Sequence, residues 1–138
     1  HRSCCQSNHF WLVSLTARRS TEVQRGEGIN TAVTTLVNSN QPLKLVVFDA
    51  ISSKPTLSFP VSAVVSHCSK LNVPTLVDAA HVPGMGCDGV KYFDDRCTFW
   101  VCTFHKWLGV PRGASGGMWV NVKDVKGRFK HIDRKRLV

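Results

Sequence analysis

The stretch "FWVCTFHKWLGVPRGASGGMWV", residues 99–120, joins two apolar runs through a short connection. The first run ends at His105 and Lys106, and a turn rich in proline and glycine leads into the second run. A lysine at the end of a buried strand is costly to desolvate, so either the protein uses its amine or the side chain reaches water. Which of the two applies depends on the groups that the fold brings beside Lys106.

Four runs of the chain, two of them in this stretch, have the length of strands, and two further segments have the periodicity of helices. The predicted strands are "LKLVVFD", "VPTLVD", "FWVCTF" and "GGMWVNV", at residues 43–49, 73–78, 99–104 and 116–122. Apolar residues recur at helical spacing in residues 26–40 and 59–72. A strand, a helix and another strand with continuous apolar runs are typical of parallel strands covered on both faces. The sequence therefore predicts an α/β fold with three layers and a mostly parallel sheet.

The composition is that of a single globular domain. The chain has 138 residues, of which 43% are hydrophobic and 20% are charged, and this composition argues against a disordered protein. No apolar run is long enough for a transmembrane helix, and we expect a cytoplasmic protein without a membrane partner. The first residue is His rather than Met, so we expect a fragment or a processed piece.

The cysteines and the charges exclude some kinds of site. The six cysteines have neither paired spacing nor a zinc-ligand pattern, so we predict reduced thiols and no metal. The net charge is +9, and the last sixteen residues, 123–138, hold seven Lys or Arg and two Asp, which gives +5. A basic tail can bind nucleic acid, but this one lacks interleaved aromatic residues, so a solvated terminus is the favoured interpretation.

Polar side chains follow three of the predicted strands. They are Ser52 and Ser53 after the first strand, Asp78 and His81 after the second, and Thr103, His105 and Lys106 after the third. Each of them alone is more simply a turn residue, a surface histidine or a lysine that reaches water. The carboxyl ends of parallel strands meet at one edge of the sheet, however, and ligands gather there. We therefore expect these side chains to lie together.

The combination matches the needs of pyridoxal phosphate. Desolvation at a strand end favours a neutral lysine amine, which forms a Schiff base with an aldehyde. An aspartate facing the lysine can keep a pyridine nitrogen protonated, which makes the ring an electron sink. In this interpretation His81 contacts the ring or its phenolate oxygen, and Thr103 and His105 donate hydrogen bonds to the phosphate.

These segments carry a family resemblance. "LVDAAHVPGM" and "FHKWLGVPRGASGGMWV", with 28 residues between Asp78 and Lys106, resemble the core of the class V aminotransferase family of pyridoxal-phosphate enzymes. The nearest branch is the isopenicillin N epimerase-like and cysteine desulfurase-like group, and the resemblance covers residues 43–120. It implies a partial large domain with the aspartate aminotransferase-like fold at residues 23–122. Residues 1–22 stay unassigned, and residues 123–138 form the basic tail.

The resemblance also implies roles for individual residues. Lys106 would form the Schiff base and act as a catalytic base, and Asp78 would pair with the pyridine nitrogen. His81 would contact the phenolate oxygen, His105 and Thr103 would bind the phosphate, and Ser53 would lie on the substrate side. The substrate would be an amino acid, and the full-length parent would be a homodimer.

Several functions stay open at this point. Lyase, desulfurase, epimerase and transaminase reactions share the same first step, and the sequence does not choose among them. Cysteine desulfurases also need a mobile nucleophilic cysteine, and none of the six is well placed for it. One alternative is a non-catalytic truncated fragment that cannot hold the cofactor. Another, less favoured, is a basic module that binds nucleic acid.

Overall fold

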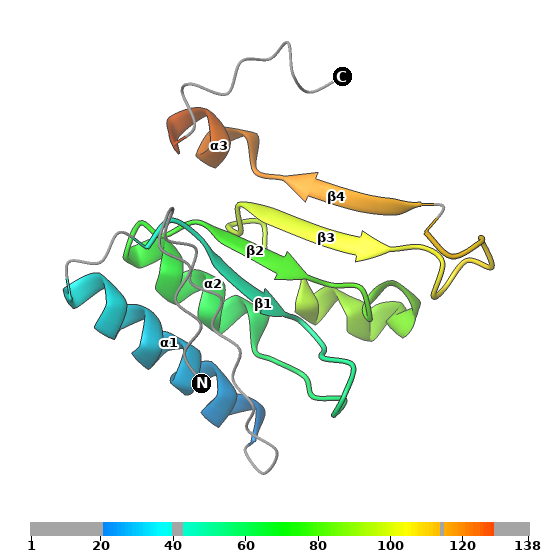
Figure 1. Cartoon of the computed structure of the whole chain (residues 1–138), viewed down its shortest axis with the longest axis horizontal. Helices are drawn as coiled ribbons and strands as arrows, with labels where there is room; N and C mark the ends of the chain where they lie inside the picture. The colour runs from blue at the N-terminus through cyan, green and yellow to red at the C-terminus, as the bar shows by residue number, and fades with distance from the viewer. Residues whose placement is uncertain (1–20, 40–42, 114, 129–138) are drawn as a thin grey trace, which may run out of the picture.

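The structure is a computed structural model that describes residues 21–39, 43–113 and 115–128 (Figure 1). Residues 1–20, which the sequence analysis left without an assignment, lie outside this part of the chain. So do residues 129–138 of the predicted basic tail. The described elements form one four-stranded sheet with helices packed against it. No helix among the described residues is both long and apolar enough to cross a membrane.

Helix α1 (Glu22–Asn38) starts earlier than the apolar periodicity predicts because its first turn is capped. The hydroxyl of Thr21 accepts a hydrogen bond from the Gln24 amide at 3.2 Å, and the Gln24 side chain accepts one from the Thr21 amide at 2.9 Å. This reciprocal capping box satisfies two amide groups that the helix itself leaves unpaired. The buried stripe of α1 includes Ile29 and Val33, which turn toward the rest of the core.

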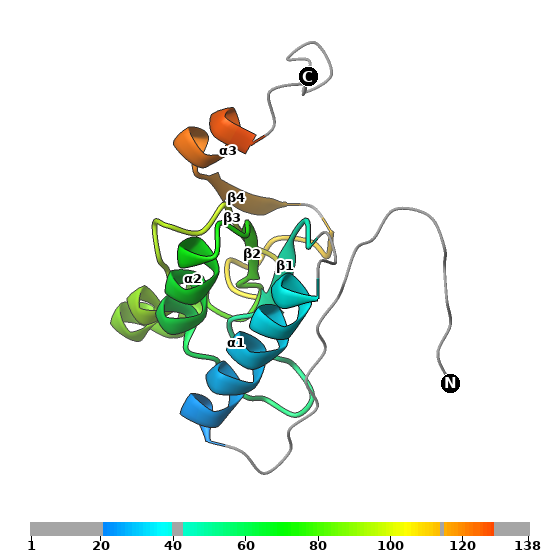
Figure 2. The ribbon, with the colours of Figure 1, turned by 90° about the vertical axis from the view of Figure 1, so that its left-hand side faces the viewer.

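Helix α2 (Val61–Lys70) links the first two strands and confirms the predicted strand, helix, strand order. Its buried residues recur at helical spacing and have almost no exposed surface: Val61, Val64, Val65 and Cys68. Helices α1 and α2 pack on each other and cover the same face of the sheet, as Figure 2 shows. The apolar stripe of α2 therefore closes the core between the helices and the sheet.

The sheet has the strand order β1-β2-β3-β4. Strands β1 (Val46–Asp49), β2 (Thr75–Asp78) and β3 (Phe99–Thr103) are parallel, whereas β4 (Gly116–Val120) runs antiparallel to β3. A ten-residue 3₁₀ helix, η1 (Pro83–Tyr92), lies between β2 and β3. The mostly parallel sheet predicted from the sequence is confirmed, and the carboxyl ends of its three parallel strands meet at one edge.

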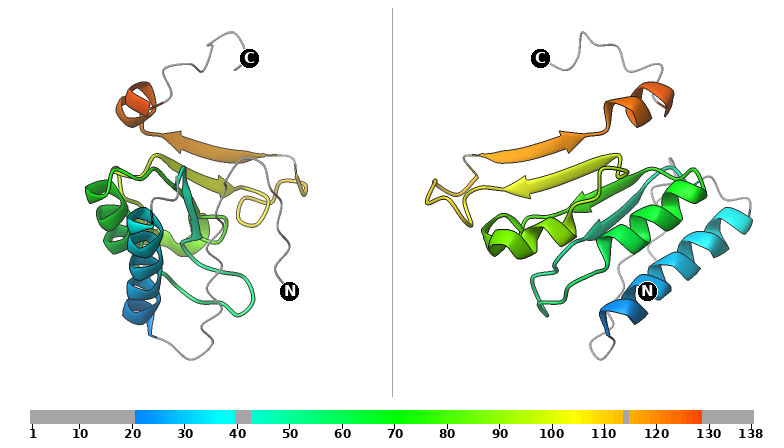
Figure 3. Two further views of the ribbon diagram at one scale, coloured as in Figure 1. Left: turned by 60° about the vertical axis from the view of Figure 1, so that its left-hand side comes forward. Right: turned by 180° about the vertical axis from the view of Figure 1, so that it is seen from behind.

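The two faces of the sheet differ in their neighbours. Val46, Phe48 and Val77 point toward the helices and are buried. Their chain neighbours, such as Val47 and Leu76, point to the opposite face and are only partly buried. In Figure 3 the helices α1 and α2 lie on one side of the sheet in both views. The second helical layer expected from the sequence is not formed by the residues that the structure describes.

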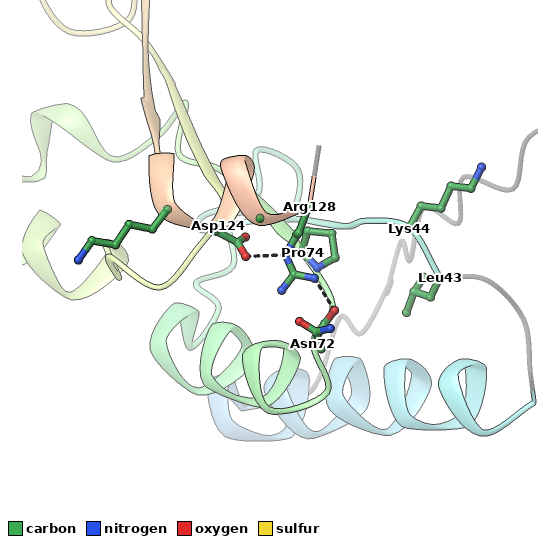
Figure 4. Close-up of a pocket in the computed structure, with 8 residues that line it drawn as sticks. Leu43, Lys44, Asn72, Pro74, Asp124 and Arg128 are labelled. Atoms are coloured by element: carbon green, nitrogen blue, oxygen red, sulfur yellow. Dashed lines mark hydrogen bonds and ion pairs between the residues drawn. The ribbon is translucent and has the colours of Figure 1, made fainter. Parts of the chain in front are cut away.

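Helix α3 (Val122–Arg128) lies at the amino edge of the sheet, opposite to the edge where the parallel strands end. Figure 4 shows that Arg128 bridges the Asp124 carboxylate and the carbonyl oxygen of Asn72, with 2.6 Å between the Arg128 guanidinium and that carbonyl. Residues 123–128 of the predicted basic tail therefore belong to a helix, which Arg128 ties to Asn72 although none of its residues is buried.

A hydrogen-bond relay continues this contact into the sheet. The Thr98 hydroxyl, which is buried, donates to the Asp124 carboxylate and accepts a hydrogen bond from the Thr75 amide at 3.1 Å. The hollow beside this relay has a volume of about 650 Å³, and Lys44 at its rim points away from Arg128 (Figure 4). Arg128 is held by Asp124 and Asn72, and Lys44 is directed outward, so these two cations do not converge on the hollow.

Candidate active site at the carboxyl edge of the sheet

Two carboxylates stand side by side at the ends of neighbouring strands. Asp49 is the last residue of β1 and Asp78 the last residue of β2, and the parallel register pairs them directly. Since paired residues of adjacent strands project from the same face, both side chains lie on the face away from α1 and α2. Asp78 was predicted as a site residue, whereas Asp49 was missed.

The environment of Asp49 supports this placement. Partial burial, and then repulsion by Asp78, raise the pKa of Asp49 above its ordinary value, while His81 and Lys106 act in the opposite direction. A carboxylate feels such effects only from groups a few ångströms away or across a poorly solvated path. The two acids, the imidazole and the amine therefore form one electrostatic cluster.

His81 and Lys106 are in direct contact. The Nζ atom of Lys106 lies 2.8 Å from Nε2 of His81, and Nδ1 of His81 lies 3.2 Å from the carbonyl oxygen of Ile51. A carbonyl only accepts, so Nδ1 carries the proton and Nε2 presents its lone pair to the lysine. The imidazole therefore accepts a hydrogen bond from Lys106 and fixes the position of its amine.

Lys106 is exposed to solvent. The sequence suggested a lysine desolvated at a buried strand end, but β3 ends at Thr103 and the chain turns before Lys106. The amine thus reaches the strand edge from a turn rather than from the strand itself. Its position depends on His81 instead of on burial.

The turn after β2 is tied to the turn after β3 through one peptide unit. The Asp78 carboxylate accepts a hydrogen bond from the Ala80 amide at 2.9 Å. The carbonyl oxygen of Ala80 accepts from the Trp107 indole at 3.0 Å and from the Thr103 hydroxyl at 3.4 Å. Asp78 therefore also acts as a turn residue, and Thr103 also helps to hold the two turns together.

Trp107 follows Lys106 directly and depends on a glycine. A side chain at Gly84 would collide with the indole ring of Trp107, so only glycine allows this contact. The sequence analysis assigned no role to Gly84 or Trp107. The signal was present, because a glycine follows the histidine of "HVPG" and a tryptophan follows the His-Lys pair.

His105 precedes Lys106 in the chain and lies beside a hollow next to it. Both residues line this hollow, of about 510 Å³, together with Arg112 and Gly113. The Nδ1 atom of His105 is shielded from solvent and has no hydrogen-bond partner in the described part of the chain. A ring nitrogen in this state is suited to a ligand atom.

Ser53 does not join the cluster. It lies exposed in the loop after β1, where its carbonyl oxygen accepts a hydrogen bond from the Thr56 hydroxyl at 3.2 Å. Within residues 21–39, 43–113 and 115–128, no hydrogen bond or ion pair joins Ser53 to Asp78, His81 or Lys106. Its predicted place beside the substrate stays a prediction.

Three of the cysteines are packing residues. Cys68, Cys97 and Cys102 are buried with free thiols. Burial raises the pKa of Cys68 to about 11 and that of Cys97 to about 12, so both stay protonated and poorly nucleophilic at neutral pH. Over the same described residues, no three His, Cys, Asp or Glu side chains are grouped so as to hold a metal ion.

Two curated proteins resemble half of the chain. It is 31% identical over 70 residues to the "Probable L-cysteine desulfhydrase, chloroplastic" of Arabidopsis thaliana. It is 35% identical over 69 residues to the "L-cysteine desulfhydrase-like protein lolT1" of Epichloe uncinata. The matched part is 50% of this chain but only 14% and 15% of those proteins. No protein-family model matches the chain.

Solved structures share the fold over a longer stretch. The Catharanthus roseus tryptophan decarboxylase matches 74% of this chain with a TM-score of 0.62 and 18% identity, and the match is 23% of that chain. A structure of "SPT with PLP" matches 77% of this chain with a TM-score of 0.55 and 25% identity, and covers 27% of its own chain. These likenesses confirm the predicted α/β fold.

Proposed function

We propose that this chain is part of a large domain of the fold-type I pyridoxal-phosphate-dependent enzymes. In this proposal it binds the cofactor through Lys106 and acts on an amino acid. The observation that carries the proposal is the cluster at the carboxyl edge, in which the Lys106 amine lies 2.8 Å from His81. The same edge presents the Asp49 and Asp78 pair. The predicted assignment to class V is part of the proposal.

The residues at this edge fit the cofactor's three polar ends. An amine for the aldehyde is present in Lys106, and a carboxylate for the ring nitrogen is present in Asp78. The shielded Nδ1 of His105 lacks a protein partner and is available to an oxygen of the phosphate. When bound, the cofactor supplies an electron sink that stabilises negative charge on the amino acid's α-carbon.

Each protein group then has a defined task. Asp78 holds the proton of the ring nitrogen, because a carboxylate beside that nitrogen favours its charged form. The amine of Lys106 would serve as the general base for the proton on the α-carbon of the amino acid. His81 accepts a hydrogen bond from Nζ and keeps the amine directed toward the strand ends. Thr103 has its hydroxyl near Ala80 and is left with lone pairs for a phosphate contact.

We assign L-cysteine as the substrate, in a desulfhydrase (lyase) reaction, because both curated relatives are named for it. The buried thiols of Cys68 and Cys97 are unsuited to carry sulfur, which argues against a desulfurase that uses either of them. Dimerisation of the full-length parent and a cytoplasmic location remain predictions from the sequence.

The test uses the full 138-residue chain. Incubation with pyridoxal phosphate and reduction with borohydride should fix the cofactor on the peptide that contains Lys106. Sulfide release from L-cysteine then measures turnover. A label elsewhere would refute the proposed site. A label on Lys106 without sulfide release would favour the non-catalytic fragment.

A further inference from the structure

Helix α3 has an apolar side that the described part of the chain does not bury. None of its residues is buried, and Val122 is 55% exposed. The hydrogen bonds that hold the helix involve Asp124 and Arg128, which lie one turn apart on another side. Val122 and the half-buried Val125 follow a different side of the helix, and these polar contacts do not use them.

The sequence continues this apolar side beyond the described end of α3. Val122, Val125, Phe129 and Ile132 follow one another at intervals of three, four and three residues. These intervals place side chains on one side of an α-helix, where they form a single apolar stripe. The core among the described residues includes no residue of α3. The stripe therefore needs a partner outside this core.

The same segment carries over half of the net charge of the chain. Residues 123–138 contribute +5 to a total of +9. Within α3 the side chains of Lys123 and Lys126 are exposed. With Lys130 and Arg134 they recur at intervals of three and four residues, and so follow a second side of the same helical pattern. An apolar side beside a strongly cationic side is typical of helices that lie in the interface of a membrane.

We propose that residues 122–134 form a basic amphipathic helix that binds the surface of a bilayer containing anionic lipids. The cations lie against the lipid headgroups, and the apolar stripe enters the boundary between headgroups and acyl chains. A nucleic acid would neutralise the same cations but leave the stripe in water. A groove on an acidic protein needs several large anchors, and the stripe has one aromatic side chain, that of Phe129. A lipid surface is the partner that uses both sides.

This contact lies apart from the candidate active site. Helix α3 is at the amino edge of the sheet, away from the carboxyl edge with the cluster around Lys106 (Figure 1). The inference is therefore independent of the proposed function. It differs from the expectation of no membrane partner, which rested on the absence of a long apolar run, because a helix on the surface of a bilayer needs no such run.

The first experiment measures sedimentation of the full 138-residue chain with vesicles. One set of vesicles is pure phosphatidylcholine, and the other adds phosphatidylserine at about one lipid in three. Affinity for the mixed vesicles should be at least about tenfold higher and should fall as salt is raised. Equal affinity for the two sets would overturn the inference.

Paired substitutions test the two sides of the helix. Phe129→Ser with Ile132→Ser removes much of the apolar stripe, keeps every charge, and should weaken binding to the mixed vesicles at least about tenfold. Lys123→Gln with Lys126→Gln should weaken it as well and lessen its dependence on salt. Val90→Ser is the matched control, because Val90 is 74% exposed on η1, and it should change neither.

Gly127 tests the helix itself rather than its side chains. A methyl group added there would meet no atom within 4 Å, so Gly127→Ala should favour the helix and strengthen binding. Gly127→Pro keeps all charges but breaks the helix, and should weaken binding. Equal binding by the two variants, or unchanged binding after loss of Phe129 and Ile132, contradicts the amphipathic helix. Tighter binding to a DNA duplex than to the mixed vesicles at the same salt concentration would identify nucleic acid as the partner instead.

Discussion

Asp49 and Asp78 are register partners at the ends of two parallel strands, so two carboxylates share one corner of the sheet. The folded state holds a proton on Asp49 more tightly than the unfolded chain does, because burial and Asp78 raise its pKa. Stability that depends on this proton is present at acid pH and is lost as the pH rises through the raised value. Ionised Asp49 therefore costs the protein stability at neutral pH.

We expect Asp49→Asn to raise the melting temperature at neutral pH. The gain should be on the order of 0.5 kcal/mol, since the carboxyl group is largely open to solvent. It should shrink as the pH falls below about 4 and vanish once the aspartate is protonated in both the folded and the unfolded state. Thermal unfolding followed by circular dichroism across this range measures the effect. Asp88→Asn, on the exposed side of η1, is the control, and an equal gain from it would contradict the explanation.

Lys106→Ala should abolish the reductive label and lower turnover by about 10²–10⁴-fold, because it removes a positioned acid–base group. Lys70→Ala and Lys91→Ala should keep both, because these lysines lie on α2 and η1 and not at the carboxyl edge. Mass spectrometry of the reduced chain locates the label. Normal turnover in Lys106→Ala would make the assignment wrong.

His81→Ala should leave the lysine in place but without its acceptor. A hydrogen bond of this kind contributes about 1 kcal/mol, so the apparent affinity for the cofactor should fall about fivefold. His81→Gln offers a replacement acceptor and should recover part of the loss. His67→Ala removes a histidine that contacts Thr34 between the helices, and it serves as the matched control. Equal losses from His67→Ala and His81→Ala would indicate a general loss of stability.

Gly84→Ala should displace the indole of Trp107 from its contact with residue 84. Overpacking of this kind costs about 1–3 kcal/mol, and it also breaks the hydrogen bond from Trp107 to Ala80. Tryptophan fluorescence and chemical denaturation report the change. Gly89→Ala is the control, because its new methyl group would meet Val82 at an ordinary 3.5 Å. Unchanged stability in Gly84→Ala would show that the ring has another position of similar energy.

Asp94 should produce a second pH dependence, at the acid end. Hydrogen bonds from Arg96, and a further one from Ser62, lower the pKa of Asp94 to about 2. This contribution to stability is present above about pH 4 and is lost as the pH falls toward about 2. Because the Arg96 side chain is 47% exposed, screening reduces the effect to about 1 kcal/mol. Asp94→Asn should remove this loss of stability at acid pH, whereas Asp95→Asn should preserve it.

The fold could be predicted because its signals are periodic. Runs such as residues 73–78 and the spacing of Val61, Val64, Val65 and Cys68 follow from burial alone. The start of α1 was placed too late because a capping box of polar residues, not an apolar pattern, sets it. The helical form of residues 122–128 was missed since it depends on the distant Asn72 and Thr98.

The candidate site could be predicted only in part. Chain order after each strand identifies Asp78, His81 and Lys106, because parallel strands end at one edge. Asp49 was missed because its importance comes from the register, which a single strand does not reveal. The exposure of Lys106, and the position of Arg112 beside the same hollow, depend on the path of the connection between β3 and β4, which the sequence does not fix.

The parallel pairing of β1, β2 and β3 also has a consequence for biosynthesis. Asp49, Asp78 and Lys106 lie far apart in the sequence. They come together only when β1, β2 and β3 pair, and α2 and η1 lie between these strands in the chain. A nascent chain that ends at Thr103 holds both acids but not Lys106. Non-local pairing is slow compared with helix formation, so this chemistry is acquired at the end of folding. Under the proposed function, selective attachment of the cofactor to Lys106 therefore marks a completed sheet.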